Sequence, residues 1–382
     1  MDRRQFIYSL FSSMVLSQLN PTFASSAINP SKTLILIELK GGNDGLNTLV
    51  PFNDPLYSKL RPNLGLKQNE IIQLKPELFL HKSLSPWKQL WLDQDLAIVQ
   101  GLGYKNPIRS HFRSIDIWDT ASDSDEYLNH GWLNDCLAMK RSTYDFEGLI
   151  LGSSDPGPLQ GGDINSLVIK NQKQFLRTAK RVKQSKHQAN NPSLMHFESI
   201  KQDIQSSYEM IQKKLDPSIQ VDGFQKDKLS RALKSAAQYI LSGVNVPVIK
   251  VTLGGFDTHS NQKNTHANLL RQLGNATSNF ARIMKKHNLW DQVVLATYSE
   301  FGRRAQENGS KGSDHGTANT HFVMGGQVKG GLFGEAAKLD NLVNNDLQYT
   351  QDFRSYVKTL VENTLKTDAP QRLKNFEKMA FL

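Results

Sequence analysis

The chain has little cysteine and, beyond its N-terminal segment, no long apolar run. Cys136 is the single cysteine among 382 residues, which excludes an intrachain disulfide and leaves a packed core as the source of stability. No later stretch approaches the ~20 apolar residues that a membrane-spanning helix needs, so we expect no stable membrane anchor. A chain of this length is long enough for one large domain or two ordinary ones.

Apolar residues do gather in the N-terminal segment, which has the features of an export signal. Arg3 and Arg4 precede a short apolar stretch that begins at Ile7, and small residues follow it. This order is typical of a secretory signal peptide, and paired arginines favour the twin-arginine route, which carries folded proteins. We therefore expect a twin-arginine signal peptide over residues 1–27, the twin-arginine translocase as a partner during export, and a location in the periplasm.

Acidic residues are fewer than basic ones, with 36 Asp and Glu against 46 Lys and Arg and a formal charge of +10. The charge alone does not distinguish anionic substrates, nucleic acid and anionic lipid as partners. Much of the excess lies in a basic stretch that starts at Lys170, and helical spacing of apolar residues follows it. We interpret residues 170–242 as a helical insertion that covers the sheet or its mouth. A basic stretch is most often a solvated helix face, and the lack of interleaved aromatic residues argues against nucleic acid.

Short apolar runs alternate with helical patterns along the rest of the chain. Runs of this kind that end in Gly or acidic residues are typical of buried parallel strands. Strands that alternate with helices predict an α/β layer architecture. The expected strands are residues 33–39, 95–100, 246–253 and 293–298 and a run from Phe322, and the expected helices begin near Ser110 and at Tyr356.

Acidic and imidazole side chains cluster beside these runs, mostly in the last third of the chain. Asp257 and His259 follow one expected strand, Glu300 follows the next, and we expect these two strands to be adjacent in the sheet. In an open α/β sheet, ligands bind beyond the carboxyl ends of the strands. Carboxylates and imidazoles gathered there suit a divalent metal ion, Zn, Mn, Ca or Mg. The other candidates of this kind are Asp44 in a Gly-rich turn after the first strand, Asp314, His315 and His321.

Several of these residues have a structural interpretation beside the functional one. Asp44 also suits an Asp-Gly turn without a ligand, and Asp314 suits either a turn or a side chain that orients a histidine. Ser110 is placed to cap a helix or to lie in its first turn. His111 is either a hydrogen-bonded neighbour of the site or an acid or metal ligand. His266 is expected on the helix after His259, where it either reaches the metal or lies too far from it.

Six short motifs combine these residues. They are Gly41-Gly42-Asn43-Asp44-Gly45, Ser110-His111-Phe112, Gly254-Gly255-Phe256-Asp257-Thr258-His259, Ser299-Glu300-Phe301-Gly302-Arg303, Ser313-Asp314-His315-Gly316 and His321-Phe322-Val323-Met324-Gly325-Gly326. Together with the paired arginines they resemble those of an uncharacterised bacterial family in the alkaline phosphatase and sulfatase superfamily. The resemblance covers nearly all of the chain after the signal. It implies a three-layer α/β/α alkaline-phosphatase-like sheet over residues 28–382.

The resemblance also implies a metal-dependent hydrolase in which two metal sites flank a nucleophile at the start of a helix. By position, Ser110 resembles the hydroxyl nucleophile, and Asp44 resembles the carboxylate after the first strand. Asp257 and His259 resemble the acid and the imidazole of one metal site, and Glu300 resembles the acid of the other. The helix that begins at Ser110 would add partial positive charge and backbone donors for an anion.

Two further assignments concern the end of the chain. His315 and His321 compete for the late histidine ligand, since His315 follows an aspartate whereas His321 precedes an expected strand. Arg303 is expected to clamp a substrate oxygen with two hydrogen bonds.

The chain also departs from the superfamily pattern. Active phosphatases usually show Asp-His where this chain has Glu300-Phe301, so one imidazole of the second metal site is missing. The motif that formylglycine sulfatases need is absent around Ser110 and Cys136, which ranks phosphate ester hydrolysis above sulfate ester hydrolysis. We expect a periplasmic hydrolase of an anionic small-molecule or polymer ester. The alternative is a catalytically silent protein with this fold, acting as an exported binding or assembly factor.

Overall fold

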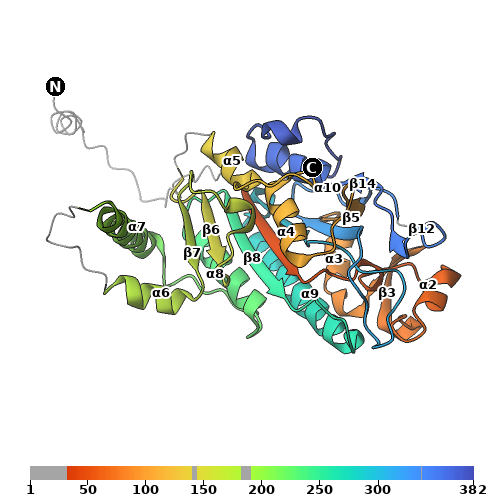
Figure 1. Cartoon of the computed structure of the whole chain (residues 1–382). Coiled ribbons are helices and arrows are strands. Elements are labelled where there is room, and N and C mark those ends of the chain that lie inside the picture. The colour runs from red at the N-terminus through yellow and green to blue at the C-terminus, as the bar shows by residue number, and fades with distance from the viewer. Residues whose placement is uncertain (1–31, 140–143, 182–190, 337) are drawn as a thin grey trace, which may run out of the picture. The chain divides into compact units, whose positions relative to one another are not determined.

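A computed structural model describes residues 32–139, 144–181, 191–336 and 338–382, and the expected signal peptide lies outside this part of the chain. A long mixed sheet forms the centre of the described chain (Figure 1). Its strands lie in the order β11-β5-β10-β9-β1-β8-β6-β7, and β14 also pairs with β5. The bounds are β1 Thr33–Lys40, β5 Leu96–Gly103, β6 Gly148–Leu151, β7 Ser166–Ile169, β8 Val248–Gly254, β9 Val293–Tyr298, β10 Asn319–Met324, β11 Gly331–Phe333 and β14 Gln351–Asp352.

Parallel pairing dominates the sheet and places β1 at its middle. β1 pairs parallel with β8 on one side and with β9 on the other. The expectation that the strands before Asp257 and Glu300 are adjacent is wrong, because β1 lies between β8 and β9, although all three strands are parallel and end at the same edge of the sheet. The expectation of parallel pairing is wrong for the strand that contains His321, because β10 pairs antiparallel with both β5 and β9. No described helix separates β9 from β10, and a parallel return would need a crossover.

Helices cover both faces of the sheet, so the fold is a three-layer α/β/α arrangement. Ile35 and Ile37 of β1 pack in the core with α3, α8 and α9. Leu34 and Leu36, which point to the opposite face, pack in a second core with α4, α5 and α10 (Figure 1). The helices are α2 Pro55–Leu60, α3 Trp87–Leu92, α4 His111–Thr120, α5 Trp132–Ala138, α6 Gln172–Ala179, α7 Pro192–Lys214, α8 Lys228–Leu241, α9 Gln262–Lys286 and α10 Phe353–Leu360.

The region interpreted as a helical insertion, residues 170–242, contains α6, α7 and α8. α8 is amphipathic, and Leu229 and Leu233 on its apolar face are buried against the sheet. Its N-terminus is capped by Asp227, whose carboxylate accepts from the backbone amide of Ser230 at 2.8 Å. α8 is thus part of the layer that covers the sheet.

Two short sheets complete the described structure. One packs near the end of β1 and has the order β2-β4-β3, and the other is a two-stranded pair of β12 and β13. Their bounds are β2 Leu49–Val50, β3 Ile71–Lys75, β4 Leu78–His81, β12 Leu342–Val343 and β13 Asp346–Leu347. None of the described helices has the length and apolar character needed to cross a membrane.

Candidate metal centre

The turns that follow β1, β8 and β9 meet at one end of the sheet. The backbone amide of Gly41, after β1, donates to Glu300 Oε1, after β9, at 2.8 Å. Gly41 has a φ of 114°, and a Cβ at this position would come within 2.4 Å of the amide nitrogen of Asp257, after β8. Glycine is therefore needed here both for the backbone conformation and for the close approach of the two turns.

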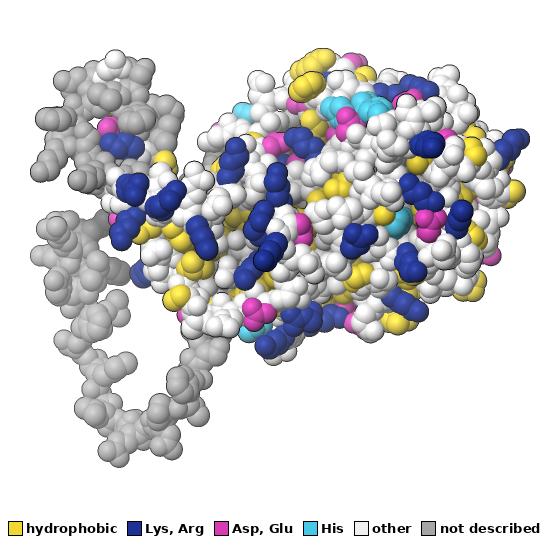
Figure 2. Space-filling model, turned by 90° about the horizontal axis from the view of Figure 1, so that it is seen from below, with side chains coloured by type: hydrophobic (Ala, Val, Ile, Leu, Met, Phe, Trp, Pro, Cys, Tyr) yellow, Lys and Arg dark blue, Asp and Glu magenta, His cyan; other side chains and the backbone are white. Residues whose placement is uncertain are grey.

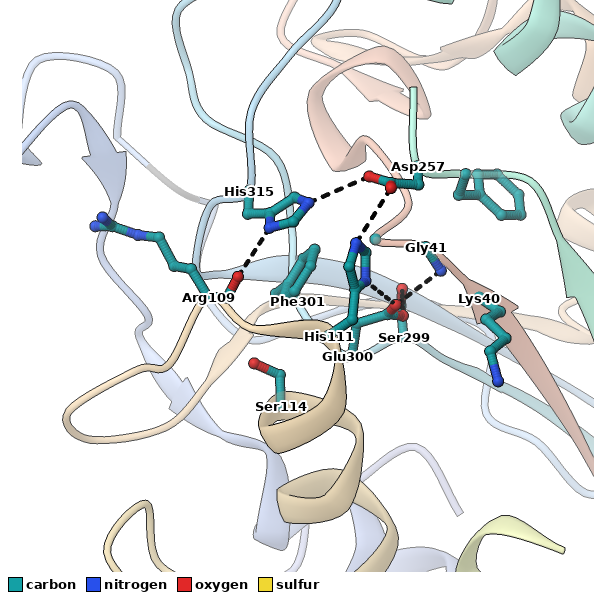
Figure 3. Close-up of polar contacts among 12 residues, drawn as sticks. Lys40, Gly41, Arg109, His111, Ser114, Asp257, Ser299, Glu300, Phe301 and His315 are labelled. Carbon is teal, nitrogen blue, oxygen red and sulfur yellow. Dashed lines mark hydrogen bonds and ion pairs between the residues drawn. The ribbon is translucent and has the colours of Figure 1, made fainter. Parts of the chain in front are cut away.

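Three imidazoles surround the carboxylate of Asp257. His259 Nε2 lies 3.0 Å and His315 Nε2 lies 3.2 Å from Asp257 Oδ1. His111 Nε2 lies 3.3 Å from Asp257 Oδ2. Figure 3 shows His111 and His315 directed at Asp257 from two sides. His111 at the start of α4, His259 in the turn after β8 and His315 are far apart in the sequence, and the fold brings their Nε2 atoms to one carboxylate.

The second ring nitrogen of each imidazole, Nδ1, contacts an oxygen atom on the side away from Asp257. His315 Nδ1 lies 2.8 Å from the carbonyl oxygen of Arg109, which can only accept, so Nδ1 carries the proton. His259 Nδ1 lies 3.2 Å from Asp314 Oδ1, and His111 Nδ1 lies 2.9 Å from Glu300 Oε1. Three outward acceptors thus fix the ring orientations. In the neutral rings they leave the Nε2 lone pairs facing Asp257.

This arrangement brings electron-rich atoms together. The Nε2 atoms of His259 and His315 are 2.9 Å apart, and both lie within 3.2 Å of Asp257 Oδ1. Within the described chain, His111 Nε2 is buried and makes no hydrogen bond. Lone pairs that converge in this way need a shared proton or a cation between them. Histidines whose outer nitrogen donates to a carbonyl or carboxylate are the usual form of a metal ligand.

The charges around the centre favour an ionised Asp257 and a neutral His315. Burial alone would raise the pKa of Asp257, but the hydrogen bond and the positive charge of Arg303 lower it to about 2. Burial lowers the pKa of His315. The hydrogen bond to Glu300 raises the pKa of His111, so this imidazole gains a proton more readily than His315. A carboxylate and neutral imidazoles are the protonation states that metal binding requires.

Arg303, expected to clamp substrate, is buried beneath the centre. Its Nη2 donates to Asp257 Oδ1 at 2.7 Å, and its Nε donates to the carbonyl of Gly42 at 2.9 Å. Its side chain is fully buried, and it also donates to the carbonyls of Gly41, Phe256 and Ser313. These contacts tie the turns after β1 and β8 together. The expectation that Arg303 binds a substrate oxygen stays a prediction, and none of these contacts supports it.

Glu300 lies behind His111. Its Oε1 accepts from the amide of Gly41 and faces His111 Nδ1, and its Oε2 accepts from Ser299 Oγ at 3.2 Å. The side chain is buried. The structure therefore places Glu300 as a residue that orients His111, whereas its assignment as a direct metal ligand remains a prediction.

Asp44 lies in a buried polar cluster of its own. Its Oδ2 pairs with Arg61 Nη1 at 2.6 Å and accepts from Gln262 Nε2. Burial would raise the pKa of Asp44, but the Arg61 guanidinium lowers it. His266 lies nearby and contacts Asn43 Oδ1 at 3.0 Å. Because Arg61 neutralises Asp44, the charge that would attract a cation is already compensated.

The structure distinguishes the two late histidines. His315 joins Asp257, whereas His321 is buried within β10, with its ring centroid 5.2 Å from that of Trp118. Burial lowers the pKa of His321 to about 3. His315 reaches the centre because the chain after β9 doubles back, with an antiparallel bridge between Arg303 and His315. The geometry favours His315 over His321 as the ligand.

Ser110 is the N-cap residue of α4, as its position predicted, and His111 is the first residue of that helix. Ser110 is exposed, and its hydroxyl makes no capping hydrogen bond. The first turn of α4 contains no acidic residue. The free amides of a helix N-terminus and an uncommitted hydroxyl thus stand beside His111, where an anion is favoured.

His111 is the residue of the centre that sequence reasoning underrated. Its only signal was its place after Ser110 at a helix start, and this does not reveal that Glu300 lies behind it. Asp314 was expected either in a turn or as a residue that orients a histidine, and its contact with His259 confirms the latter. Asn308 also donates to Asp314, and this hydrogen bond lowers the pKa of that carboxyl.

A second group of possible ligands, His130, Asp135 and Asp163, lies apart from this centre. Asp135 already pairs with Arg372 at 2.5 Å, and Asp163 accepts from Asn134 at 2.9 Å. These contacts occupy the carboxylates, so we regard this group as a surface polar cluster.

The fold and the geometry define an α/β/α protein with a histidine-rich centre at the ends of its parallel strands. The family described as "Protein of unknown function (DUF1501)" matches residues 164–365, which is more than half of the chain, and the chain belongs to this family. No curated protein sequence matches the chain.

Three solved structures are reported as similar. The C-terminal periplasmic domain of EptC from Escherichia coli, in complex with Zn, is 9% identical, with 91% of this chain and 85% of that chain covered and a TM-score of 0.41. A protein in the alkaline phosphatase superfamily from Vibrio parahaemolyticus is 11% identical, with coverages of 90% and 69% and a TM-score of 0.41. A phosphonate monoester hydrolase of Agrobacterium radiobacter is 9% identical, with coverages of 88% and 74% and a TM-score of 0.39.

Proposed function

We propose that this protein is a metal-dependent hydrolase of a phosphate ester, with a divalent ion held by Asp257, His259, His315 and His111. The observation that carries the proposal is the orientation of the imidazoles, whose Nδ1 atoms face Arg109, Asp314 and Glu300 and whose Nε2 atoms face Asp257. Two of these Nε2 atoms lie 3.0 and 3.2 Å from Asp257 Oδ1 and the third lies 3.3 Å from Oδ2, so a bound cation would join all three imidazoles to the carboxylate.

The donor set indicates which ions fit. Imidazole and carboxylate donors suit zinc and manganese, whereas calcium and magnesium prefer sites made of oxygen atoms. Among Zn, Mn, Ca and Mg, we therefore expect Zn or Mn to bind most tightly. Glu300 and Asp314 then act as the outer residues that hold His111 and His259 in orientation.

The residues of the chain suggest how an ester would be positioned. A phosphate group at the N-terminus of α4 would accept hydrogen bonds from the free backbone amides of its first turn. Ser110 Oγ would form a bond to phosphorus as the bond from phosphorus to the leaving oxygen breaks, and the hydroxyl proton would pass through solvent to the leaving oxygen. Water would then attack phosphorus, release phosphate and return a proton to Ser110 Oγ. A bound ion would supply charge neutralisation and a lower pKa for the attacking hydroxyl.

Metal binding and catalysis are tested separately. Stripped protein is titrated with Zn, Mn, Ca or Mg while unfolding is monitored, and retained metal is measured by elemental analysis. Binding adds RT ln(1 + [L]/Kd), about 2.7 kcal/mol at 100 times Kd. His315→Ala should abolish the shift, whereas His287→Ala, which changes an exposed histidine at the end of α9, should retain it.

Activity is then measured on phosphomonoesters, phosphodiesters and sulfate esters. Absence of both metal and thermal shift would count against the metal centre. Metal binding without turnover of any ester would instead support the alternative, a silent exported binding or assembly factor.

The proposal includes export of the folded protein by the twin-arginine translocase. Its support is the sequence alone, since Arg3 and Arg4 precede a short apolar stretch and small residues. Replacing both arginines by lysine should leave the precursor in the cytoplasm. Wild-type amounts of the doubly substituted protein in the periplasm would contradict this route.

A further inference from the structure

A band of cations, exposed except for the half-buried Lys234, crosses the neighbouring helices α6 and α8 and the turn that follows α6. Ser235 Oγ of α8 donates to Gln172 Oε1 of α6 at 2.9 Å, so the two helices lie against each other. In Figure 1 both run along the lower side of the sheet, and the view from below in Figure 2 shows Lys and Arg side chains gathered there. We call these residues the α6/α8 band, and they are Lys173, Arg177, Lys180, Arg181, Lys228, Arg231 and Lys234.

The described contacts leave the charges of the α6/α8 band uncompensated by acidic groups, and Arg231 Nη1 donates to the carbonyl oxygen of Lys226 at 2.7 Å. None of the seven forms an ion pair with an acidic residue in the described parts of the chain. The nearest acid in sequence, Asp227, is engaged with the amide and the hydroxyl of Ser230 at the start of α8. The band therefore repels itself, and an external anion would relieve that repulsion.

The spacing of the band suits an extended partner. Lys228, Arg231 and Lys234 follow one another at three-residue intervals along α8, which corresponds to about 4.5 Å of rise between neighbours. Lys173 and Arg177 repeat at a four-residue interval on α6. Two such rows match a linear chain of negative charges better than a single compact anion.

The apolar side chains of this region argue against a membrane. A helix that lies in a lipid surface needs an apolar face free to enter it. Phe175 and Leu176 of α6 instead pack against the core, and in the described chain no large hydrophobic residue of α6 or α8 is exposed. Aromatic platforms for single-stranded nucleic acid are absent from these two described helices for the same reason.

We propose that the α6/α8 band binds a linear polyanion of the acidic polysaccharide class. The binding needs neither the metal centre nor hydrolysis, so it stands or falls independently of the proposed function. The contacts would be mainly electrostatic, because the band consists of long flexible cations. Such binding weakens steeply as salt rises.

The test uses labelled heparin as the probe and fluorescence anisotropy as the readout, with the full exported chain in NaCl from about 50 to 200 mM. The patch variant combines Lys173→Glu, Arg177→Glu and Arg231→Glu. The matched control combines Lys59→Glu, Lys75→Glu and Lys88→Glu, which are also exposed and remove the same charge. We expect the patch variant to lose at least roughly tenfold in affinity, and the control to stay near wild type.

Several outcomes would overturn the proposal. Failure of wild type to bind heparin would do so, and so would equal loss in the patch and control variants, which would indicate an effect of net charge. Duplex DNA or phosphatidylglycerol vesicles that bind more tightly than heparin, with loss in the same patch variant, would assign the band to another class of partner. If the patch variant does not fold, glutamine at the same three positions removes the cations with less repulsion and gives the same comparison.

Discussion

The Nε2 atoms of His259 and His315 face each other across 2.9 Å, and each lies beside the same oxygen of Asp257. Asp314 holds His259 in this orientation, and the carbonyl of Arg109 holds His315. This pair of imidazoles therefore offers the sharpest tests of the proposed metal centre.

The first prediction concerns the residue that orients His259. Asp314→Ala should weaken zinc or manganese binding by roughly 10- to 100-fold, because His259 loses the acceptor that fixes its ring. Asp314→Asn should weaken binding less, since its amide oxygen still accepts. Isothermal titration of the stripped variants measures both affinities. Equal affinities for wild type and Asp314→Ala would remove Asp314 from the centre.

The second prediction concerns Ser110. If its hydroxyl is the nucleophile, Ser110→Ala should lower the rate of hydrolysis on the order of a thousandfold or more, because several kcal/mol of transition-state stabilisation are lost. The variant should retain its metal. The cost in stability should be smaller than the ~1 kcal/mol typical of an N-cap, because Ser110 makes no capping bond. Kinetics and urea unfolding of the same preparation check the two numbers.

Full activity in well-folded Ser110→Ala would contradict the nucleophile assignment. Attack would then have to come from water activated by the same ligands. Ser110→Asp provides a control, since aspartate is a good N-cap but cannot act as the alkoxide.

The third prediction separates a structural role for Asp44 from a ligand role. Arg61→Met should destabilise the protein by about 3–5 kcal/mol, because Asp44 remains buried without its partner. Adding Asp44→Asn to Arg61→Met should recover part of that loss. Urea unfolding of the two single variants and the double variant gives the coupling. A folded Asp44→Asn protein that no longer binds metal would instead support Asp44 as a ligand.

The fourth prediction is a dependence of stability on pH that arises from His321. Its folded pKa of about 3 lies below the unfolded value near 6.5, so between these values the unfolded chain binds more protons. The stability contributed by the neutral ring is complete above pH 6.5 and is lost as pH falls toward 3. From pH 7 to pH 5 this loss is about 2 kcal/mol for one such histidine.

Between pH 7 and pH 5, the free energy of unfolding of His321→Leu should therefore fall by about 2 kcal/mol less than that of wild type. This difference does not depend on the stability of the variant at pH 7. Urea unfolding at both pH values measures the difference. His266, whose pKa burial also lowers to about 3, contributes equally to both proteins and cancels. Identical pH slopes for the two proteins would show that His321 is not a buried neutral group.

The sequence predicted the central strands well, because their apolar runs are nearly uninterrupted. β1, β8 and β9 lie within a few residues of the predicted positions, and their adjacency places Asp257 and Glu300 at one end of the sheet. The direction of β10 was not accessible in this way. The direction of β10 depends on whether the connection after β9 contains a crossover helix. The hydrophobic periodicity of a long irregular loop does not differ clearly from that of a helix with a weak apolar pattern.

The positions of the candidate site residues in the sequence do not determine which of them meet in the fold. His315 and His321 are six residues apart, but one lies on the doubled-back loop and the other points from β10 into the core. Asp44 was a reasonable candidate until the fold brought Arg61 against it. His111 could not be ranked without knowing that Glu300 lies behind it. In each case, the decisive partner comes from a distant or irregular segment.

The contacts of Arg303 bear on how fast the proposed centre would take up a metal ion. Its guanidinium holds the backbone of Gly41, Gly42, Phe256 and Ser313 as well as the carboxylate of Asp257. All of these bonds are made within the chain itself, so they should hold the turns in the same shape in stripped and metal-loaded protein. An arriving ion would then replace water and protons with little rearrangement of the chain. Association should be fast, and residence time rather than arrival should decide which ion the protein keeps.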